Sequence, residues 1–122
     1  MKNLHEYFVY TTTNPNRTAL YVGVTNDVAA RLVEHYANRG KPDSFAGKYY
    51  CYCLIYLESY QYVNDAIARE KELKGWLREK KDALIDSFNP QRKFLNVEWC
   101  GEWPPQYIWK DYYESLRKPK KE

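Results

Sequence analysis

Two side chains on one predicted helix have the chemistry that a phosphate group would require. Arg31 and His35 are four residues apart, so they share one face of a helix expected over residues 27–38. A guanidinium offers a fixed fork of donors to phosphate oxygens, and an imidazole can shuttle a proton near neutral pH. The pair therefore suits phosphate chemistry, and a solvated surface pair is the alternative that this spacing leaves open.

A third candidate, Glu70, falls within the apolar stripe of a second predicted helix. That stripe consists of Ala66, Ile67, Glu70, Leu73 and Leu77. Burying a carboxylate is costly unless the group is paired or binds a metal ion. A lone hard oxygen ligand suits Mg²⁺, which keeps several of its waters. The alternative is a glutamate at the edge of the stripe that pairs with Arg69 or Lys74.

Two tyrosines stand on neighbouring predicted strands. Residues Glu6–Thr13 and Ala19–Thr25 are rich in β-branched and aromatic residues, and a short polar turn joins them into an antiparallel hairpin. Tyr10 lies on the first strand and Tyr21 on the second, with Gly23 two positions further on. A glycine inside a strand often marks the close approach of a ligand or another backbone. The sequence leaves open whether the tyrosines line a site or fill the edge of the core.

Taken in order, these residues resemble the pattern of the GIY-YIG nucleases. Phe8-Val9-Tyr10, ten intervening residues and Tyr21-Val22-Gly23 resemble the paired GIY and YIG triplets, with Phe8 in place of the first glycine. The second helix carries an Arg-Glu-x-Glu-Leu-Lys run similar to that of the small stand-alone bacterial members. The resemblance covers residues 5–92.

The other matches to the family are single residues. Arg31 falls where the family places its helix arginine, His35 matches a position held by His or Tyr one turn later, and Glu70 matches the metal-binding glutamate. Asn89, before Pro90, resembles a late asparagine of the family. The resemblance thus implies a hydrolysis of phosphodiesters with one divalent metal ion.

The resemblance also implies a role for each residue. Glu70 would hold one Mg²⁺ or Mn²⁺ ion as a Lewis acid, and Arg31 would stabilise the charge that grows at phosphorus. Tyr21 or His35 would take the proton from the attacking water, with Tyr21 favoured and His35 assisting. Tyr10 would hydrogen-bond near Tyr21 and position it.

Around these residues, the periodicity predicts an α/β (α+β) fold: a small, mostly antiparallel three-stranded sheet flanked by helices. After the hairpin, the predicted elements are a helix over 27–38 capped by Thr25 or Asn26, a loop over 39–48, a third strand over Lys48–Tyr60 and a long helix from residue 63 or 64 to Ser87. Residues 1–92 form the expected GIY-YIG nuclease-like domain. Residues 93–122 form an expected aromatic-rich extension, which packs on the same domain and ends in a short helix and a basic tail.

The composition sets limits on the compartment and on the partners. The formal net charge is only +3, so a phosphate site must be local rather than a broad basic face. Cys51, Cys53 and Cys100 include no C-x-x-C pair, and we expect reduced packing thiols in a reducing compartment. Residues Met1–Tyr10 show no signal pattern, and the chain has no apolar run of membrane length, so we expect a cytoplasmic protein without membrane association.

The expected function is that of a metal-dependent endonuclease of DNA, in a process such as DNA repair, with specificity set by substrate structure or by a protein partner. Lys48, at the mouth of the third strand, and Asn89 are expected to contact the nucleic acid. A non-catalytic nucleic-acid-binding module is the main alternative, since Arg31, Lys48 and exposed aromatics would serve binding alone. A protein-interaction domain with an aromatic patch over Trp99–Tyr113 is a third alternative.

Overall fold

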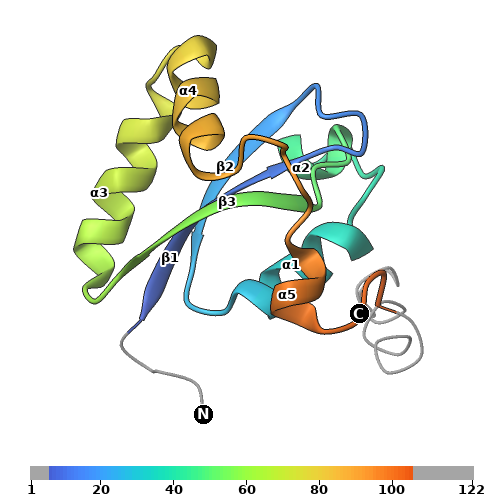
Figure 1. The fold of residues 1–122 in the computed structure, drawn as a ribbon. Coiled ribbons are helices and arrows are strands. Elements are labelled where there is room, and N and C mark those ends of the chain that lie inside the picture. The colour runs from blue at the N-terminus through green and yellow to red at the C-terminus, as the bar shows by residue number, and fades with distance from the viewer. Residues whose placement is uncertain (1–5, 106–122) are drawn as a thin grey trace.

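A three-stranded antiparallel sheet forms the centre of the molecule. The structure is a computed structural model that describes residues 6–105. Its strands are β1 (Tyr7–Thr13), β2 (Leu20–Thr25) and β3 (Cys53–Tyr60), in the order β2-β1-β3, so β2 and β3 are edge strands (Figure 1). The predicted α+β fold with a small antiparallel sheet is confirmed.

The β1–β2 hairpin sets which side chains share a face of the sheet. Tyr10 pairs with Gly23, and Thr12 pairs with Tyr21, so these four residues point to the same side. The Asn14 side chain stabilises the turn because its Oδ1 accepts hydrogen bonds from the backbone N–H groups of Thr18 and Ala19, at 2.8 and 2.9 Å.

Five helices surround the sheet within the described residues: α1 (Val28–Ala37), α2 (Phe45–Lys48), α3 (Val63–Lys74), α4 (Arg78–Phe88) and α5 (Asn96–Cys100). The predicted N-cap of the first helix is wrong by one or two residues. Asp27 caps α1, because its Oδ1 accepts from the Ala30 N–H at 3.1 Å, whereas the Thr25 hydroxyl accepts from the Asp27 N–H at 3.0 Å.

The predicted loop over residues 39–48 contains a short helix, and the third strand is shorter than expected. Helix α2 occupies Phe45–Lys48 and is capped by Ser44, whose hydroxyl accepts from the Gly47 N–H at 3.1 Å. As a result β3 begins at Cys53 rather than at Lys48.

The predicted single long helix is in fact two helices. Helix α3 ends at Lys74, and Gly75, a poor helix former, precedes the turn into α4. The break lets Trp76 turn back onto the α3 side of the core, where the Arg69 guanidinium lies 5.1 Å from its ring centroid. Leu77, expected on the buried stripe, is instead 75% exposed.

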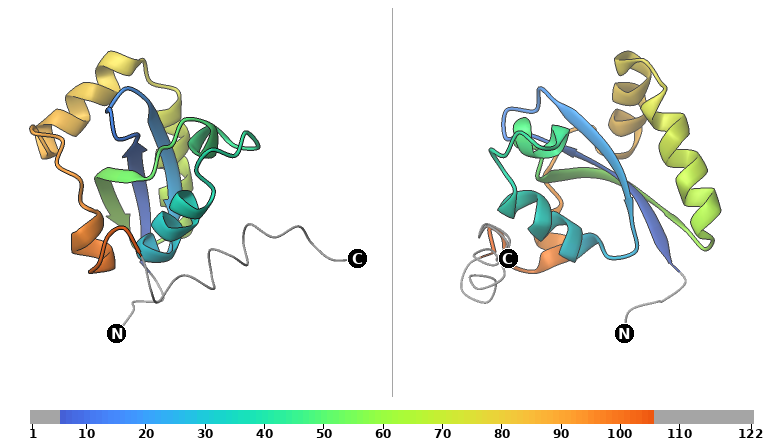
Figure 2. Two further views of the ribbon diagram at one scale, coloured as in Figure 1. Left: turned by 90° about the vertical axis from the view of Figure 1, so that its right-hand side faces the viewer. Right: turned by 180° about the vertical axis from the view of Figure 1, so that it is seen from behind.

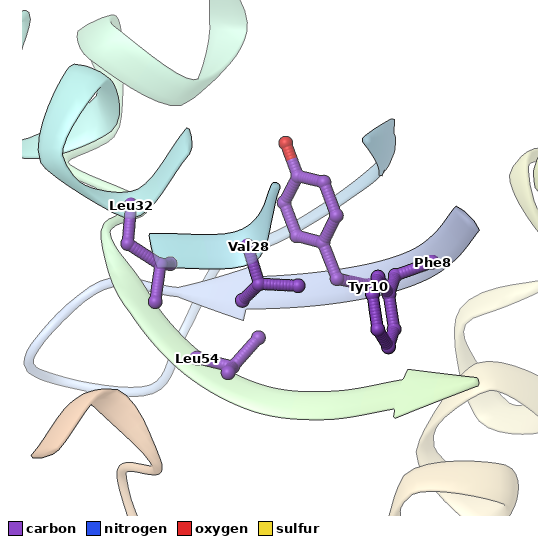
Figure 3. Packing of buried hydrophobic residues seen from close by; sticks show 5 residues of the cluster. All are labelled: Phe8, Tyr10, Val28, Leu32 and Leu54. Carbon is purple, nitrogen blue, oxygen red and sulfur yellow. The ribbon is translucent and has the colours of Figure 1, made fainter. Parts of the chain in front are cut away.

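The sheet lies between two groups of helices, with α1 and α5 on one side and α3 and α4 on the other (Figures 1 and 2). On the α1 side the buried cluster consists of Phe8, Tyr10, Val28, Leu32 and Leu54 (Figure 3). On the α3 side it consists of Val9, Val22, Ala66 and Leu73. Figure 3 also shows the Tyr10 hydroxyl pointing away from Leu54, out of the apolar cluster.

The first part of the predicted extension packs on the α1 side. The Asn96 amide links α5 to the start of β3: its Oδ1 accepts from the Leu54 N–H and its Nδ2 donates to the Tyr52 carbonyl, both at 2.8 Å. The Trp99 ring meets Phe8 edge-on at 5.2 Å. Most of the expected Trp99–Tyr113 patch, and the expected terminal helix and basic tail, fall on residues 106–122, outside the described residues.

All three cysteines are free, as predicted. Burial raises the pKa of Cys51 to about 11 and that of Cys53 to about 12, so both stay as thiols at neutral pH. In the part of the chain that the structure describes, no helix combines the length and the apolar character that crossing a bilayer demands.

Candidate active site

A cavity of about 190 Å³ opens between β2, α1 and the segment that leads into α2. It is lined by Tyr21, Arg31, Glu34, His35, Asn38, Ser44 and Ala46. Three of the predicted site residues therefore share one hollow, as the spacing of Arg31 and His35 and the position of Tyr21 suggested.

Tyr10 lies beneath this cavity and is hydrogen-bonded to two of the residues that line it, Arg31 and His35. Its side chain is 1% exposed, its hydroxyl shares a hydrogen bond with the His35 Nε2 at 2.7 Å, and the hydroxyl oxygen accepts from the Arg31 Nε at 3.1 Å. Burial raises the pKa of the Tyr10 phenol well above its ordinary value, and the neighbouring Arg31 offsets only part of that rise. Tyr10 thus stays protonated and acts as a fixed donor and acceptor.

His35 is neutral in this setting. Burial, and then the positive charge of Arg31, lower the pKa of His35 to about 4. A low pKa and the Nε2 hydrogen bond with Tyr10 both disfavour the proton shuttle that the sequence suggested for His35.

Arg31 is fixed at two of its nitrogens. Its Nε donates to the Tyr10 hydroxyl, and its Nη1 lies 3.1 Å from the Glu34 Oε1, one helical turn further along α1. The side chain is still 40% exposed. The guanidinium is therefore already oriented to donate hydrogen bonds to a phosphate oxygen at the mouth of the cavity.

Tyr21 is held by ring packing rather than by the Tyr10 hydroxyl. Its ring meets His35 edge-on at 5.2 Å and lies tilted to Tyr10 at 6.2 Å. The expectation that Tyr10 positions Tyr21 through a hydrogen bond is not met, because the Tyr10 hydroxyl bonds with Arg31 and His35. Of the two tyrosines, only Tyr21 lines the cavity.

Glu70 approaches from the other side of the sheet. It lies on α3, which packs against the face opposite α1, and its Oε2 makes an ion pair with the Lys74 Nζ at 2.8 Å. That ammonium lies 5.7 Å from the centroid of the Tyr21 ring. Because β2 is an edge strand, α3 can reach the site around it, although Glu70 does not share the α1 face of the sheet with Tyr10 and Arg31.

Comparison with known proteins decides the family. The model of the GIY-YIG catalytic domain matches residues 6–82. The chain belongs to the GIY-YIG family. Its curated relatives include UPF0213 proteins of Staphylococcus aureus strains Mu3, Mu50 and N315, each 37% identical over 67 residues, or 55% of this chain and 79% of the relative. No solved structure matches the chain.

Within this GIY-YIG domain, the two triplets are joined by one packing contact. A methyl group on Gly23 would stand 2.5 Å from the Tyr10 hydroxyl oxygen. The glycine of the second triplet therefore makes room for the tyrosine of the first. A glycine within a strand can also mark the close approach of a ligand, but here the neighbour is the Tyr10 ring.

The donor set fits a metal ion that arrives with its substrate. Glu70 has a side chain 15% exposed and offers a hard oxygen ligand. Among the described residues no group of three His, Cys, Asp or Glu could hold an ion together. A single carboxylate matches the way Mg²⁺ is commonly bound, through one or two carboxylates, waters and substrate phosphates.

Two predicted nucleic-acid contacts lie away from the cavity. Lys48 ends α2, where its Nζ lies 5.3 Å from the Tyr49 ring centroid, and it is not part of the cavity wall. Asn89 is 7% exposed and holds β3 and the following chain: its Nδ2 donates to the carbonyls of Ile55 and Lys93, and its Oδ1 accepts from the Lys93 N–H. Asn89 is therefore placed as a structural residue.

The sequence did not single out the remaining residues around the site. Glu34, Asn38 and Ser44 line the cavity, and Lys74 was considered only as a possible partner of Glu70. The spacing of Glu34 from Arg31 and of Lys74 from Glu70 is a detectable signal, since residues three or four apart meet on a helix. Asn38 and Ser44 carry no such signal, because the loop between α1 and α2 places them.

Proposed function

We propose that this GIY-YIG domain is an endonuclease that hydrolyses phosphodiester bonds of DNA with one divalent metal ion. The observation that carries the proposal is the hydrogen-bonded cluster in which buried Tyr10 fixes Arg31 and His35 at the wall of a cavity that Tyr21 also lines. Such a rigid cationic wall suits a phosphate whose charge increases in the transition state.

Arg31 binds the scissile phosphate. Its Nε and Nη1 are held by Tyr10 and Glu34, so the exposed part of the guanidinium is oriented before substrate arrives. Donors that are already oriented stabilise developing charge without reorganisation at the moment of reaction. Tyr10 and His35 act here as positioning residues.

Tyr21 accepts the proton of the attacking water. It is preferred to His35 because the His35 Nε2 is already hydrogen-bonded to Tyr10 and the pKa of His35 is about 4. The Tyr21 ring is also within reach of the Lys74 ammonium, at 5.7 Å from the centroid.

Glu70 would hold the Mg²⁺ or Mn²⁺ ion. When bound, the ion would supply Lewis acidity to the phosphate under attack. For Glu70 to serve, its ion pair with Lys74 must open, and the released ammonium can then face a phosphate. The exposed ammonium, with a side chain 49% accessible, can make that change.

A cleavage screen tests the proposal. The wild-type chain should cut at least one of duplex, branched and single-stranded DNA in the presence of Mg²⁺ or Mn²⁺, and Glu70→Gln should abolish cutting. Glu72→Gln is the matched control, since it removes an exposed carboxylate from the same helix that pairs with Arg69 instead. DNA binding that survives EDTA, with no cleavage under either metal, would instead identify a non-catalytic binding module.

A further inference from the structure

A second, shallower groove lies beside the cavity, along the edge strand β2. Its volume is about 280 Å³, and it is lined by Leu20, Tyr21, Val22, Phe45, Lys74 and Lys81. Tyr21 lines both hollows, so the groove adjoins the site of the proposed hydrolysis. Phe45 and Lys81 have no part in that reaction.

Phe45 places an exposed aromatic ring at the surface of the groove. It is 50% exposed, and the ring of Tyr49, the C-cap residue of α2, packs beside it at a centroid distance of 4.7 Å. Helix α2 is itself fixed against the end of α1, because a methyl group on Gly47 would stand 2.6 Å from the Lys41 carbonyl oxygen and 2.8 Å from that of Asn38. An exposed ring on such a fixed support can stack on a flat ligand with little loss of freedom.

Two ammonium groups lie along the same groove. Lys74 ends α3, and Lys81 lies on α4. Lys81 makes no ion pair with any of residues 6–105, so its charge faces the groove without a carboxylate partner there. A groove with an aromatic ring, an apolar floor from β2 and two lysines complements a chain of flat bases joined by phosphates.

We propose that this groove binds unpaired nucleotides of single-stranded DNA next to the scissile phosphate, with a base stacked on Phe45 and a phosphate at Lys81. A base inside a duplex is already stacked on both faces, so only an unpaired base can use the Phe45 ring. This inference rests on the proposed function and names its substrate class: DNA with a single-stranded or branched segment.

Binding in EDTA tests the groove independently of cleavage. Fluorescence anisotropy compares a short labelled single strand of DNA with its duplex on the full chain. Phe45→Ala should weaken single-strand binding about tenfold, with duplex binding unchanged, since the unpaired base loses the ring on which it stacks. Phe45→Trp should retain binding, and Lys81→Gln should reduce the salt dependence by about one phosphate contact.

Two variants control for position. Tyr62→Ala removes a ring that is even more exposed than Phe45 and lies at the end of α3 opposite Lys74. Lys80→Gln removes a charge that lies over Trp76 rather than in the groove. Both should bind as the wild type does. Phe45→Leu keeps apolar volume without an aromatic face and should repeat the loss seen with Phe45→Ala.

Three results would overturn the proposal. They are equal affinity of the wild type for single strand and duplex, full single-strand binding by Phe45→Leu, and tighter binding of an RNA strand than of the matching DNA strand. Because EDTA prevents metal-dependent cleavage, a chain that never cuts DNA but passes this test would refute the nuclease proposal and leave the groove assignment standing.

Discussion

The ring of Tyr10 lies across Gly23, its direct partner in the β1–β2 ladder. A methyl group on Gly23 would meet the Tyr10 hydroxyl oxygen at 2.5 Å and Cζ at 2.6 Å. Since that hydroxyl also bonds with Arg31 and His35, the space above one glycine fixes the position of the whole cluster.

Gly23→Ala should therefore damage both stability and activity. The added methyl must displace a ring that is 1% exposed, and overpacking of this kind costs about 1–3 kcal/mol of unfolding free energy. Urea denaturation measures the loss. Gly75→Ala is the control, because its methyl would be 3.5 Å from the nearest heavy atom and should leave stability nearly unchanged. Equal stabilities of the two variants would contradict the packing argument.

Tyr10→Phe removes one oxygen and leaves buried His35 and partly exposed Arg31 each with one hydrogen-bond partner fewer. The Arg31 Nε and the His35 Nε2 lose the hydroxyl that joins them, which should reduce the unfolding free energy by about 1–3 kcal/mol. Cleavage should fall through kcat, because Arg31 is no longer held. Tyr62→Phe, at a side chain 63% exposed, should change neither quantity. A Tyr10→Phe enzyme with wild-type stability and kcat would show that the cluster has no positioning role.

The low pKa of His35 makes the fold sensitive to acid. The unfolded chain binds a proton near pH 6.5 and the folded chain only near pH 4, so the contribution of neutral His35 is full above pH 6.5 and is lost as the pH falls towards 4. Between pH 7 and 4.5, the wild type should lose about 2 kcal/mol more stability than His35→Gln. An NMR titration that places the His35 midpoint near 6.5 would contradict this prediction.

How far the sequence predicts this molecule depends on the range of the interactions involved. Alternating side chains and the polar turn act within a few residues, so the hairpin and the shared face of Arg31 and His35 were predicted correctly. The break after Gly75 was missed because its stabilisation comes from Trp76 packing against distant residues. Helix α2 was missed because four residues are too few for a periodic signal.

The site shows the same division. Its residue types were predicted from spacing and resemblance, but their geometry depends on contacts across the fold. The approach of Glu70 around β2 follows from strand order, and the neutral state of His35 follows from burial beside Arg31. Neither strand order nor burial can be derived from local spacing alone.

Lys74 should compete with metal for Glu70. Its ammonium lies 2.8 Å from a Glu70 oxygen, so Lys74→Gln should strengthen Mn²⁺ binding by up to about fivefold, the range expected for a partly exposed ion pair. Electron paramagnetic resonance of free Mn²⁺ measures this without nucleic acid. Lys80→Gln removes the same charge away from Glu70 and should have little effect. Unchanged or weaker Mn²⁺ binding in Lys74→Gln would place the ion elsewhere.

A substitution at Asn89 tests whether this residue stabilises the fold or contacts nucleic acid. Its amide makes three hydrogen bonds that join the end of α4 to β3 and to Lys93, so Asn89→Ala should lower the unfolding free energy by about 2–3 kcal/mol. Asn64→Ala, at an exposed position on α3, should cost almost nothing. The DNA affinity of folded Asn89→Ala should equal that of the wild type, because the Asn89 side chain is buried and both of its amide hydrogens are already donated within the protein. Weaker DNA binding with unchanged stability would restore Asn89 as a nucleic-acid contact.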